Sequence, residues 1–308
     1  MKLSVIVPSL DGRVPASLLA QVAAACDGAP ALPVEVVSVV GVRPVGKARN
    51  EGLRRAKGEY IAWVDADDEV AEDWLSEILS AISAGKSTRS QDAVFFDVKK
   101  TGGWAIENDM VWGGEGGLID PKAVAREMYR DNWRMNSHLW RWVIARRHFE
   151  GVKFDETVKI WEDYLVLADI VRKCENIVYV PKKLYNYRNN LQSVIHEVDV
   201  DNELNIIKLT MARYASAPEE YKRDAFFAVM RHRYDQLERF ALLKMFRECA
   251  DERMQACLKE SRQFMRRHFA ETKTAIGWKV KFFLAGINCW WIQRLLHRAV
   301  FEAQNNVR

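Results

Sequence analysis

The sequence is poor in cysteine, with five among 308 residues, at positions 26, 174, 249, 257 and 289. No two of them form a CxxC pair, and none has a histidine at the spacing of a zinc site. This pattern argues against a zinc finger or a disulfide framework. It predicts reduced thiols, as in the cytoplasm.

Long apolar runs are also missing. The N-terminal stretch MKLSVIVPSL is too short for the apolar part of a secretion signal and reaches Pro8 at once, so it predicts a first strand. The longest apolar run, residues 282–300, is interrupted by Asn288, Gln293, Arg294 and His297. These interruptions argue against a membrane-spanning helix.

The sequence has little excess charge of either sign, with 46 basic and 42 acidic residues and a net charge of +4. Composition therefore predicts no nucleic-acid partner. The tail differs, because residues 261–308 contain nine Lys or Arg and two Glu, at 271 and 302. The remaining composition, 49% hydrophobic and 29% charged, is that of a globular chain long enough for two domains.

What is present is an alternation of strand and helix patterns over the first hundred residues. Apolar runs typical of buried strands occupy 2–8, 33–40, 59–64 and 92–100, and helical patterns occupy 15–26, 46–58 and 71–85 between them. Such alternation predicts an α/β fold with a mostly parallel sheet flanked by helices, where ligands bind beyond the carboxyl ends of the strands.

The later part of the chain changes character. A glycine-rich stretch, 101–117, predicts a loop or short edge strands, and it precedes helices at 121–131 and 161–174 and a proline-interrupted strand at 176–188. From about residue 199 only helical patterns occur. We therefore predict a catalytic domain over 1–198 and an all-helical C-terminal region over 199–308.

Three carboxylates, Asp65, Asp67 and Asp68, crowd the end of the strand 59–64. Like charges at this spacing disfavour one another's ionisation. A divalent cation such as Mn²⁺ or Mg²⁺ would relieve the repulsion and leave coordination positions for phosphate oxygens. The alternative is that Asp67 or Asp68 merely caps the helix that begins near Ala71.

Three ordered segments resemble glycosyltransferase family 2. GKARNEGLRRAKGEYIAWVDADD (46–68) is similar to a G-x-x-x-A-R-N-x-G segment leading into a D-x-D-D motif. FDETVKIWEDYLVLADIV (154–171) is similar to an F-D-E segment followed by an E-D motif at a helix start. VPKKLYNYRNNLQSV (180–194) is similar to the closing P-x-x-L-Y-x-Y-R pattern. Together they span about residues 1–196.

The resemblance implies a GT-A nucleotide-diphosphosugar transferase fold and sugar transfer with inversion, of hexosyltransferase type. It implies that Asp65 contacts the nucleotide ribose or donor sugar, that Asp67 holds the metal, and that Asp68 is a second ligand or lies beside it. It makes Asp163 the general base, a role that also suits a carboxylate at a helix N-terminus. The alternative is that WEDY is only a favourable first helical turn.

Further residues are carried over from the same motifs. Donor-binding candidates are Pro8, Asp11, Arg49, Asn50 and Arg188. Glu162 and Trp161 are candidates for the acceptor, and His196, with Ser193 nearby, is a candidate for the metal or diphosphate. The alternatives are that Arg49 and Asn50 belong to an exposed basic helix surface and that His196 is structural. Trp133, Trp140 and Trp142 could stack on acceptor sugars, but aromatic residues at this spacing are more typical of a core.

The sequence departs from the family in one respect. Members commonly carry an acidic D-D-G-S loop after the second strand, yet no acidic residue lies between Glu35 and Glu51. Base recognition then falls to Asp11 or to backbone groups, or the donor is not a uridine diphosphate sugar. The Q-x-x-R-W signature of processive synthases is also absent, which favours single additions.

The sequence thus predicts a metal-dependent transferase that moves a sugar to a glycan or lipid-linked acceptor in surface polysaccharide synthesis, in the cytoplasm. The basic, aromatic tail suits peripheral contact with the cytoplasmic face of a membrane, or else packing on the catalytic domain or on a second copy. The alternative functions are a catalytically silent glycan-binding or assembly protein of the same fold and a nucleotidyltransferase.

Overall fold

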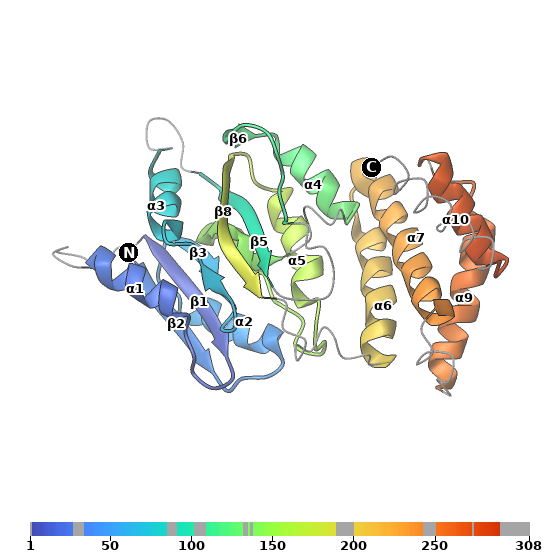
Figure 1. Cartoon of the computed structure of the whole chain (residues 1–308), viewed down its shortest axis with the longest axis horizontal. Coiled ribbons are helices and arrows are strands. Elements are labelled where there is room, and N and C mark those ends of the chain that lie inside the picture. The colour runs from blue at the N-terminus through green and yellow to red at the C-terminus, as the bar shows by residue number, and fades with distance from the viewer. Residues whose placement is uncertain are drawn as a thin grey trace, which may run out of the picture. The chain divides into compact units, whose positions relative to one another are not determined.

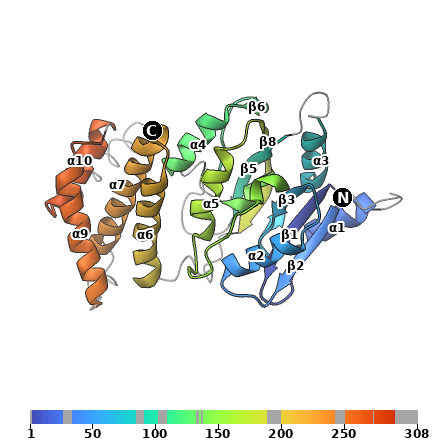
Figure 2. The same ribbon diagram turned by 180° about the vertical axis from the view of Figure 1, so that it is seen from behind.

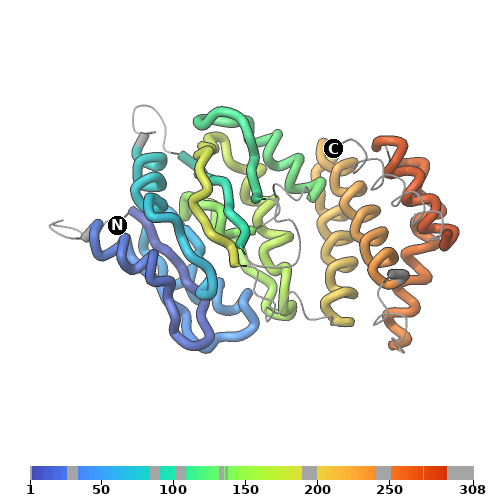
Figure 3. The backbone as a smooth tube through the Cα atoms, in the orientation of Figure 1, coloured from blue at the N-terminus to red at the C-terminus, as the bar shows by residue number. Residues whose placement is uncertain are grey.

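In the computed structural model the described residues are 2–26, 34–84, 91–101, 109–131, 135, 138–188, 200–242, 251–272 and 274–289. The chain divides into two compact units, Met1–Glu197 and Val198–Arg308. Strands and helices alternate in the first unit, and the second consists of helices (Figures 1 and 3).

The first unit is built on an eight-stranded mixed sheet with the order β2-β1-β3-β7-β5-β8-β4, in which β6 also pairs with β8. β1, β2, β3, β5 and β8 run in one direction, and β4, β6 and β7 run against them. The strands are β1 (Leu3–Ser9), β2 (Val34–Val40), β3 (Tyr60–Trp63), β4 (Glu69–Val70), β5 (Ala93–Thr101), β6 (Gly117–Ile119), β7 (Trp142–Ala145) and β8 (Ile177–Arg188).

Helices cover both faces of this sheet (Figures 1 and 2). α1 and α3 contact each other on one face, whereas α2 packs on the opposite face, where Gly52 lies against Ile6, and contacts α5. The helices of this unit are α1 (Ala16–Cys26), α2 (Val45–Arg55), α3 (Trp74–Ala84), α4 (Pro121–Tyr129) and α5 (Glu162–Val171), with short 3₁₀ helices at Leu139–Arg141 and Arg146–Phe149.

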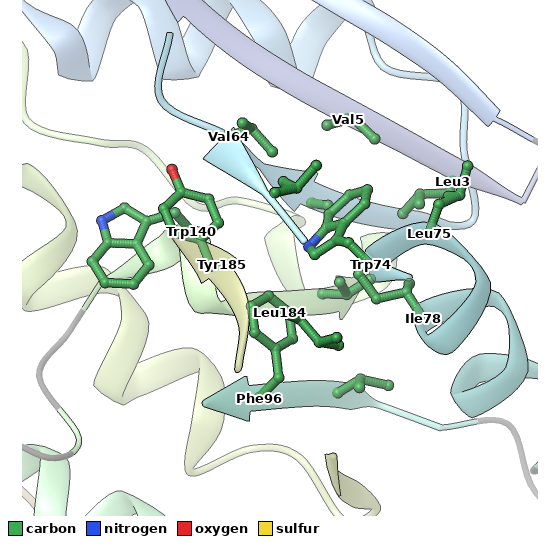
Figure 4. Close-up of a cluster of buried hydrophobic side chains, with 14 of the residues drawn as sticks. Leu3, Val5, Val64, Trp74, Leu75, Ile78, Phe96, Trp140, Leu184 and Tyr185 are labelled. Carbon is green, nitrogen blue, oxygen red and sulfur yellow. The ribbon is translucent and has the colours of Figure 1, made fainter. Parts of the chain in front are cut away.

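The core follows from the alternation of side chains along the strands. Leu3, Val5 and Val7 of β1 point to the face covered by α1 and α3, where they join Trp74 of α3 and other apolar residues (Figure 4). Trp74 is fully buried. Removing a side chain of this size from water stabilises the fold by about 2–3 kcal/mol.

β8 continues through Pro181, where the sequence predicts an interruption. The register with β5 shifts between Phe96 and Asp97, whose partners on β8 are Val180 and Lys183. Pro181 therefore lies in a bulge. A bulge tolerates proline because the missing N–H has no ladder partner to lose there.

The second unit contains α6 (Val200–Ser216), α7 (Glu219–Leu242), α9 (Glu252–His268) and α10 (Ile276–Gly286). Its core joins α7, α9 and α10 through Met230, Tyr234, Leu258 and Phe282. A buried guanidinium, that of Arg233, donates to Ser261 Oγ at 3.0 Å and Glu260 Oε1 at 2.9 Å. The described residues of this unit form helices and no strand, as predicted.

Candidate active site

The three crowded carboxylates form a tight turn directly after β3. The N–H of Asp68 donates to the carbonyl of Asp65 at 3.2 Å and closes the turn. Asp67 lies at its exposed tip, and Asp68 is buried with 3% of its surface accessible. The side chain of Asp65 is 30% exposed. The turn therefore presents Asp67 to solvent and Asp68 to the protein.

Asp68 joins the turn to the end of β8. Its Oδ2 accepts a hydrogen bond from the Tyr185 hydroxyl at 2.8 Å, and its Oδ1 accepts one from the Arg188 N–H at 2.7 Å. The same Tyr185 oxygen accepts from the N–H of Asp65 at 3.0 Å. The guanidinium of Arg188 lies 3.4 Å from Glu69 Oε1 and is mostly exposed. The predicted donor-binding Arg188 thus stands at the rim beside the carboxylate turn.

The pKa values of the turn reflect the crowding. Burial raises the pKa of Asp65, and the charges of Asp67 and Asp163 raise it further, against the opposing effect of Arg49. Burial and the charge of Asp65 raise the pKa of Asp68 to about 8, despite its two hydrogen bonds. Asp65 has the Arg49 guanidinium beside it, yet the pKa values of both carboxylates are raised, as expected of groups that a cation would complete.

The donor set also fits a divalent cation. Asp67 is exposed, and its carboxylate accepts no hydrogen bond from another described residue. In the part of the chain that the structure describes, no three His, Cys, Asp or Glu side chains are grouped to enclose a metal. A cation here would therefore take hard oxygen ligands from Asp67 and the remainder from a phosphate-bearing ligand and water.

Arg49 of α2 brings together carboxylates from two separate motifs. Its Nη1 forms an ion pair with Glu162 Oε1 and lies 3.7 Å from Asp163 Oδ2, and its Nη2 lies 3.7 Å from Asp65 Oδ1. The guanidinium also lies over the Trp63 ring at 5.9 Å. The predicted Asp65 and Asp163 therefore belong to one cluster, although 98 positions separate them in the sequence.

The predicted base lies at the start of a helix. Glu162 and Asp163 occupy the first turn of α5, where the partial positive charge of the helix end favours ionised carboxylates. Trp161 precedes them with a left-handed φ of 70°, and its ring packs on that of Tyr164 at 4.8 Å with a tilt of 34°. Asp163 keeps 14% of its side chain exposed, whereas Glu162 keeps 4%. Asp163 is thus the more accessible of the two.

Asn50, a predicted donor contact, is hydrogen-bonded within the protein. Its amide nitrogen donates to the Phe154 carbonyl at 3.0 Å and to Glu156 at 2.8 Å, and its oxygen accepts from the Phe154 N–H at 2.9 Å. The side chain is therefore engaged by the loop that leads to α5. The amide groups assigned to a nucleotide are used here within the protein.

Pro8 is the last residue but one of β1, and Asp11 lies just beyond the end of this strand. Asp11 accepts hydrogen bonds from the Arg13 N–H at 3.0 Å and from Ser9 Oγ at 3.1 Å, and these lower its pKa. Its side chain is 61% exposed. Asp11 therefore remains available to a ligand at the same sheet edge as the Asp65–Asp68 turn.

The remaining predicted residues lie either outside the described residues or in the core. Ser193, His196 and Trp133 lie outside the described residues. Trp140 and Trp142 are buried, as in their alternative assignment to the core. Trp140 stacks on Tyr185 at 4.8 Å and on Tyr187 at 5.5 Å.

Tyr185 is the site residue that sequence reasoning missed. The L-Y-x-Y-R segment drew attention to Arg188 as a ligand residue, yet Tyr185 contacts the carboxylate turn directly. Alternation along β8 was the available signal, because Tyr185 and Tyr187 must share one face of the strand.

The eight-stranded mixed sheet flanked by helices has the GT-A fold. The structure of S. aureus TarS, residues 1–349 in complex with UDP-GlcNAc, matches this chain with a TM-score of 0.61. The two are 16% identical, and the match covers 93% of this chain and 89% of that one. The predicted fold class is confirmed.

Residues 11–145 match the model of glycosyl transferase family 2. The chain is 25% identical to the uncharacterized glycosyltransferase EpsJ of Bacillus subtilis over 160 residues, 49% of this chain and 43% of EpsJ. It is 25% identical to the succinoglycan biosynthesis protein ExoO of Rhizobium meliloti over 206 residues, 65% and 57% of the two chains. The chain thus spans about half the length of these relatives. The match of residues 11–145 to the family model confirms the predicted resemblance to glycosyltransferase family 2.

Among the helices of the described residues, none has both the length and the hydropathy needed to cross a bilayer.

Proposed function

We propose that the protein is a metal-dependent, inverting glycosyltransferase that moves a sugar from a nucleotide-diphosphate donor to a hydroxyl of a glycan or lipid-linked acceptor. The observation that carries the proposal is the cluster that joins the Asp65–Asp68 turn to Asp163 through Arg49. The relative ExoO, a succinoglycan biosynthesis protein, supports a role in surface polysaccharide synthesis.

Each carboxylate has a role that its position supports. Asp65 would contact the donor's ribose or sugar, because it lies at the rim and is partly exposed. Asp67 would hold Mn²⁺ or Mg²⁺, with Asp68 beside it. Such a cation offsets the charge that develops on a departing diphosphate.

Asp163 would take the proton of the acceptor hydroxyl. An inverting transfer is a single displacement, so the base and the leaving diphosphate stand on opposite sides of the anomeric carbon. Asp163 comes from α5 and the carboxylate turn follows β3, so separate elements would hold the base and the diphosphate. Glu162 and Trp161, its neighbours, would contact the acceptor.

The experiment is a screen of nucleotide sugars, beginning with the UDP-GlcNAc found in the TarS complex, for release of nucleoside diphosphate. We expect turnover that needs Mn²⁺ or Mg²⁺ and stops with a chelator. Asp67→Ala and Asp163→Ala should each lower kcat by about 10²- to 10⁴-fold. Asp73→Ala, which removes an exposed carboxylate paired with Lys182, is the matched control and should leave kcat unchanged.

Product stereochemistry completes the test. Inversion predicts that the new glycosidic bond has the anomeric configuration opposite to that of the donor, which NMR of the product measures. Turnover that is indifferent to chelator and to both substitutions would refute the mechanism. Glycan binding without turnover of any nucleotide sugar would instead favour the silent, glycan-binding alternative.

We further propose that the second unit contacts the cytoplasmic face of a membrane. Ile276, Val280, Phe283 and Ile287 of α10 and its C-terminal end are exposed and recur at helical spacing, so they form one apolar stripe. Lys279 and Lys281 lie beside the stripe in sequence. An apolar face with flanking lysines suits an anionic interface and would hold the enzyme near a lipid-linked acceptor.

A further inference from the structure

We propose that Arg49 is a positioning residue for the catalytic base, and that α2 is the element that fixes the base segment 154–163 against the carboxylate turn. This inference deepens the proposed function and rests on it. It also gives the A-R-N segment a different role, because the resemblance to family 2 by itself implies that this segment contacts the nucleotide.

The first support is the burial of Arg49. Only 4% of its surface is accessible, and its guanidinium is enclosed by Asp65, Glu162 and the Trp63 ring. A side chain that binds a diphosphate must present its N–H groups to the cleft. Arg49 instead directs them to carboxylates, so it acts on the reaction through other residues.

The second support is the way in which the charges are distributed. Nη1 faces Glu162 and Asp163 on α5, and Nη2 faces Asp65 after β3. The planar guanidinium therefore sets the separation of the two motifs. Lysine carries the same charge on one nitrogen, so it cannot reach both sides in this fixed geometry.

The third support comes from the same helix. Asn50, the next residue, holds Phe154 through both its N–H and its carbonyl. At position 46, a side chain would collide with the carbonyl oxygen of Asp155, so glycine permits the close approach of α2. α2 thus holds the base segment at its loop through Asn50 and at its helix start through Arg49.

The consequence concerns geometry at the reacting atoms. A base must lie within hydrogen-bond reach of the acceptor hydroxyl while the donor is fixed by the other motif. A displacement of about 1 Å costs on the order of 10²-fold in rate. Arg49 therefore matters for kcat, and less for the affinity of the donor.

The experiment compares Arg49→Lys with Arg54→Lys, which changes an exposed arginine on the same helix. Donor dissociation constants come from calorimetry, and kcat and KM come from nucleoside diphosphate release. We expect Arg49→Lys to lower kcat by about 10²-fold. We also expect the donor dissociation constant of Arg49→Lys to stay within about threefold of the wild-type value. Arg54→Lys should have the kcat and the donor affinity of wild type.

A second variant is needed in case Arg49→Lys does not fold. Arg49→Met alone would leave the Glu162 carboxylate buried without its cation. We therefore combine Arg49→Met with Glu162→Gln, which removes both charges. The reference for this double variant is Glu162→Gln alone, because Glu162 is also a candidate acceptor contact. A positioning role predicts that the double variant melts near wild type with a kcat well below that of Glu162→Gln. A purely structural role predicts that the double variant and Glu162→Gln have the same kcat.

The outcomes are distinct. Donor affinity that falls at least tenfold in Arg49→Lys with kcat unchanged would make Arg49 a ligand contact and overturn the proposal. An Arg49→Lys enzyme with wild-type kcat would overturn it also, and either result leaves the proposed function standing. A wild-type protein that turns over no nucleotide sugar would instead overturn the proposed function, and this inference with it.

Discussion

The hydroxyl of Tyr185 connects both ends of the carboxylate turn, since it accepts from the Asp65 N–H and donates to Asp68. Burial and the neighbouring carboxylates raise its pKa well above 10, so the phenol keeps its proton. The ring is fixed by its stack on Trp140. One oxygen atom on β8 thus holds the residues on both sides of the turn tip that carries Asp67.

Tyr185→Phe should therefore weaken the metal site without disturbing the aromatic stack. It removes two hydrogen bonds, one of them to a carboxylate, which we expect to cost about 2 kcal/mol in the free energy of unfolding. The Mn²⁺ concentration for half-maximal turnover should rise about tenfold. Titration of activity with Mn²⁺ measures the shift.

Tyr187→Phe is the matched control for this substitution. Tyr187 stacks on the same tryptophan at 5.5 Å, but its hydroxyl forms no hydrogen bond with another described residue. Loss of the Tyr187 hydroxyl should leave the Mn²⁺ dependence of turnover unchanged. Equal effects of the two substitutions would show that the stack, rather than the Tyr185 hydroxyl, orders the turn.

The sequence predicted some features of the single site residues and missed others. The D-x-D-D and E-D carboxylates follow from local spacing, because each motif carries its chemistry within a few residues. The partners of Arg49 and Asn50 lie more than a hundred positions away for Glu162 and Phe154, and no local pattern encodes such contacts. The sequence therefore named the chemical groups but not the side chains that hold them.

At the scale of secondary-structure elements, Asp92 at the start of β5 forms hydrogen bonds with the segment before β8 and with the segment after β7. Asp92 accepts hydrogen bonds from the N–H groups of Glu175 and Asn176 before β8, and from His148 and Arg147 of the 3₁₀ helix after β7. Burial alone would raise its pKa, but these hydrogen bonds outweigh it and lower the pKa to about 2.

Asp92→Asn should destabilise the protein by about 2 kcal/mol at pH 7. Because the folded pKa is below the unfolded value of 3.8, the contribution of Asp92 is fully present above pH 4 and is lost as pH falls toward 2. Urea unfolding at pH 7 and pH 3 measures this. The difference between variant and wild type should shrink by about half at pH 3.

The matched control for this substitution is Asp120→Asn, at the exposed N-cap of α4. It also removes a carboxylate that accepts a backbone N–H, but it is not buried among several donors. A much smaller effect is expected there. An Asp92→Asn effect that did not change between pH 7 and pH 3 would contradict the assigned pKa.

Elements were predicted well where their patterns were long. The four strands and three helices over 2–100 match β1, β2, β3, β5 and α1 to α3 closely, since most of these patterns run over seven or more residues and β3 lies within the apolar run 59–64. β4, with two residues, and β7, with four, are too short to show a period. Their pairing is dictated by the neighbouring strands, which a single sequence does not display.

At the scale of the whole molecule, the two units have separate cores and different surfaces. The apolar stripe on α10 is exposed, with Ile276 at 81% and Phe283 at 41%. Transfer of two such side chains from water to an interface is worth about 3 kcal/mol or more. This is enough to decide whether a protein stays on a vesicle.

The full chain should float with vesicles of anionic phosphatidylglycerol and much less with neutral phosphatidylcholine vesicles. Val280→Ser with Phe283→Ser should reduce the bound fraction at least tenfold. Leu118→Ser, which removes an apolar side chain that is 69% exposed on β6, is the control and should have no effect.

Flotation unchanged by the double substitution would contradict the membrane proposal. A change of elution volume in size-exclusion chromatography, without any change in flotation, would assign the stripe to a second copy of the chain.

The position of β7 has a consequence for how the chain is assembled during synthesis. β7 lies in the middle of the sheet and pairs with β3 through Ala62 and Val143, and with β5 through Phe95 and Trp142. β3 and β5 are made first, so each presents an unpaired edge until residue 145 has left the ribosome. Such edges invite pairing between chains. The short run WVIA therefore joins the β2-β1-β3 part of the sheet to β5, and β8 covers the other edge of β5 later in synthesis.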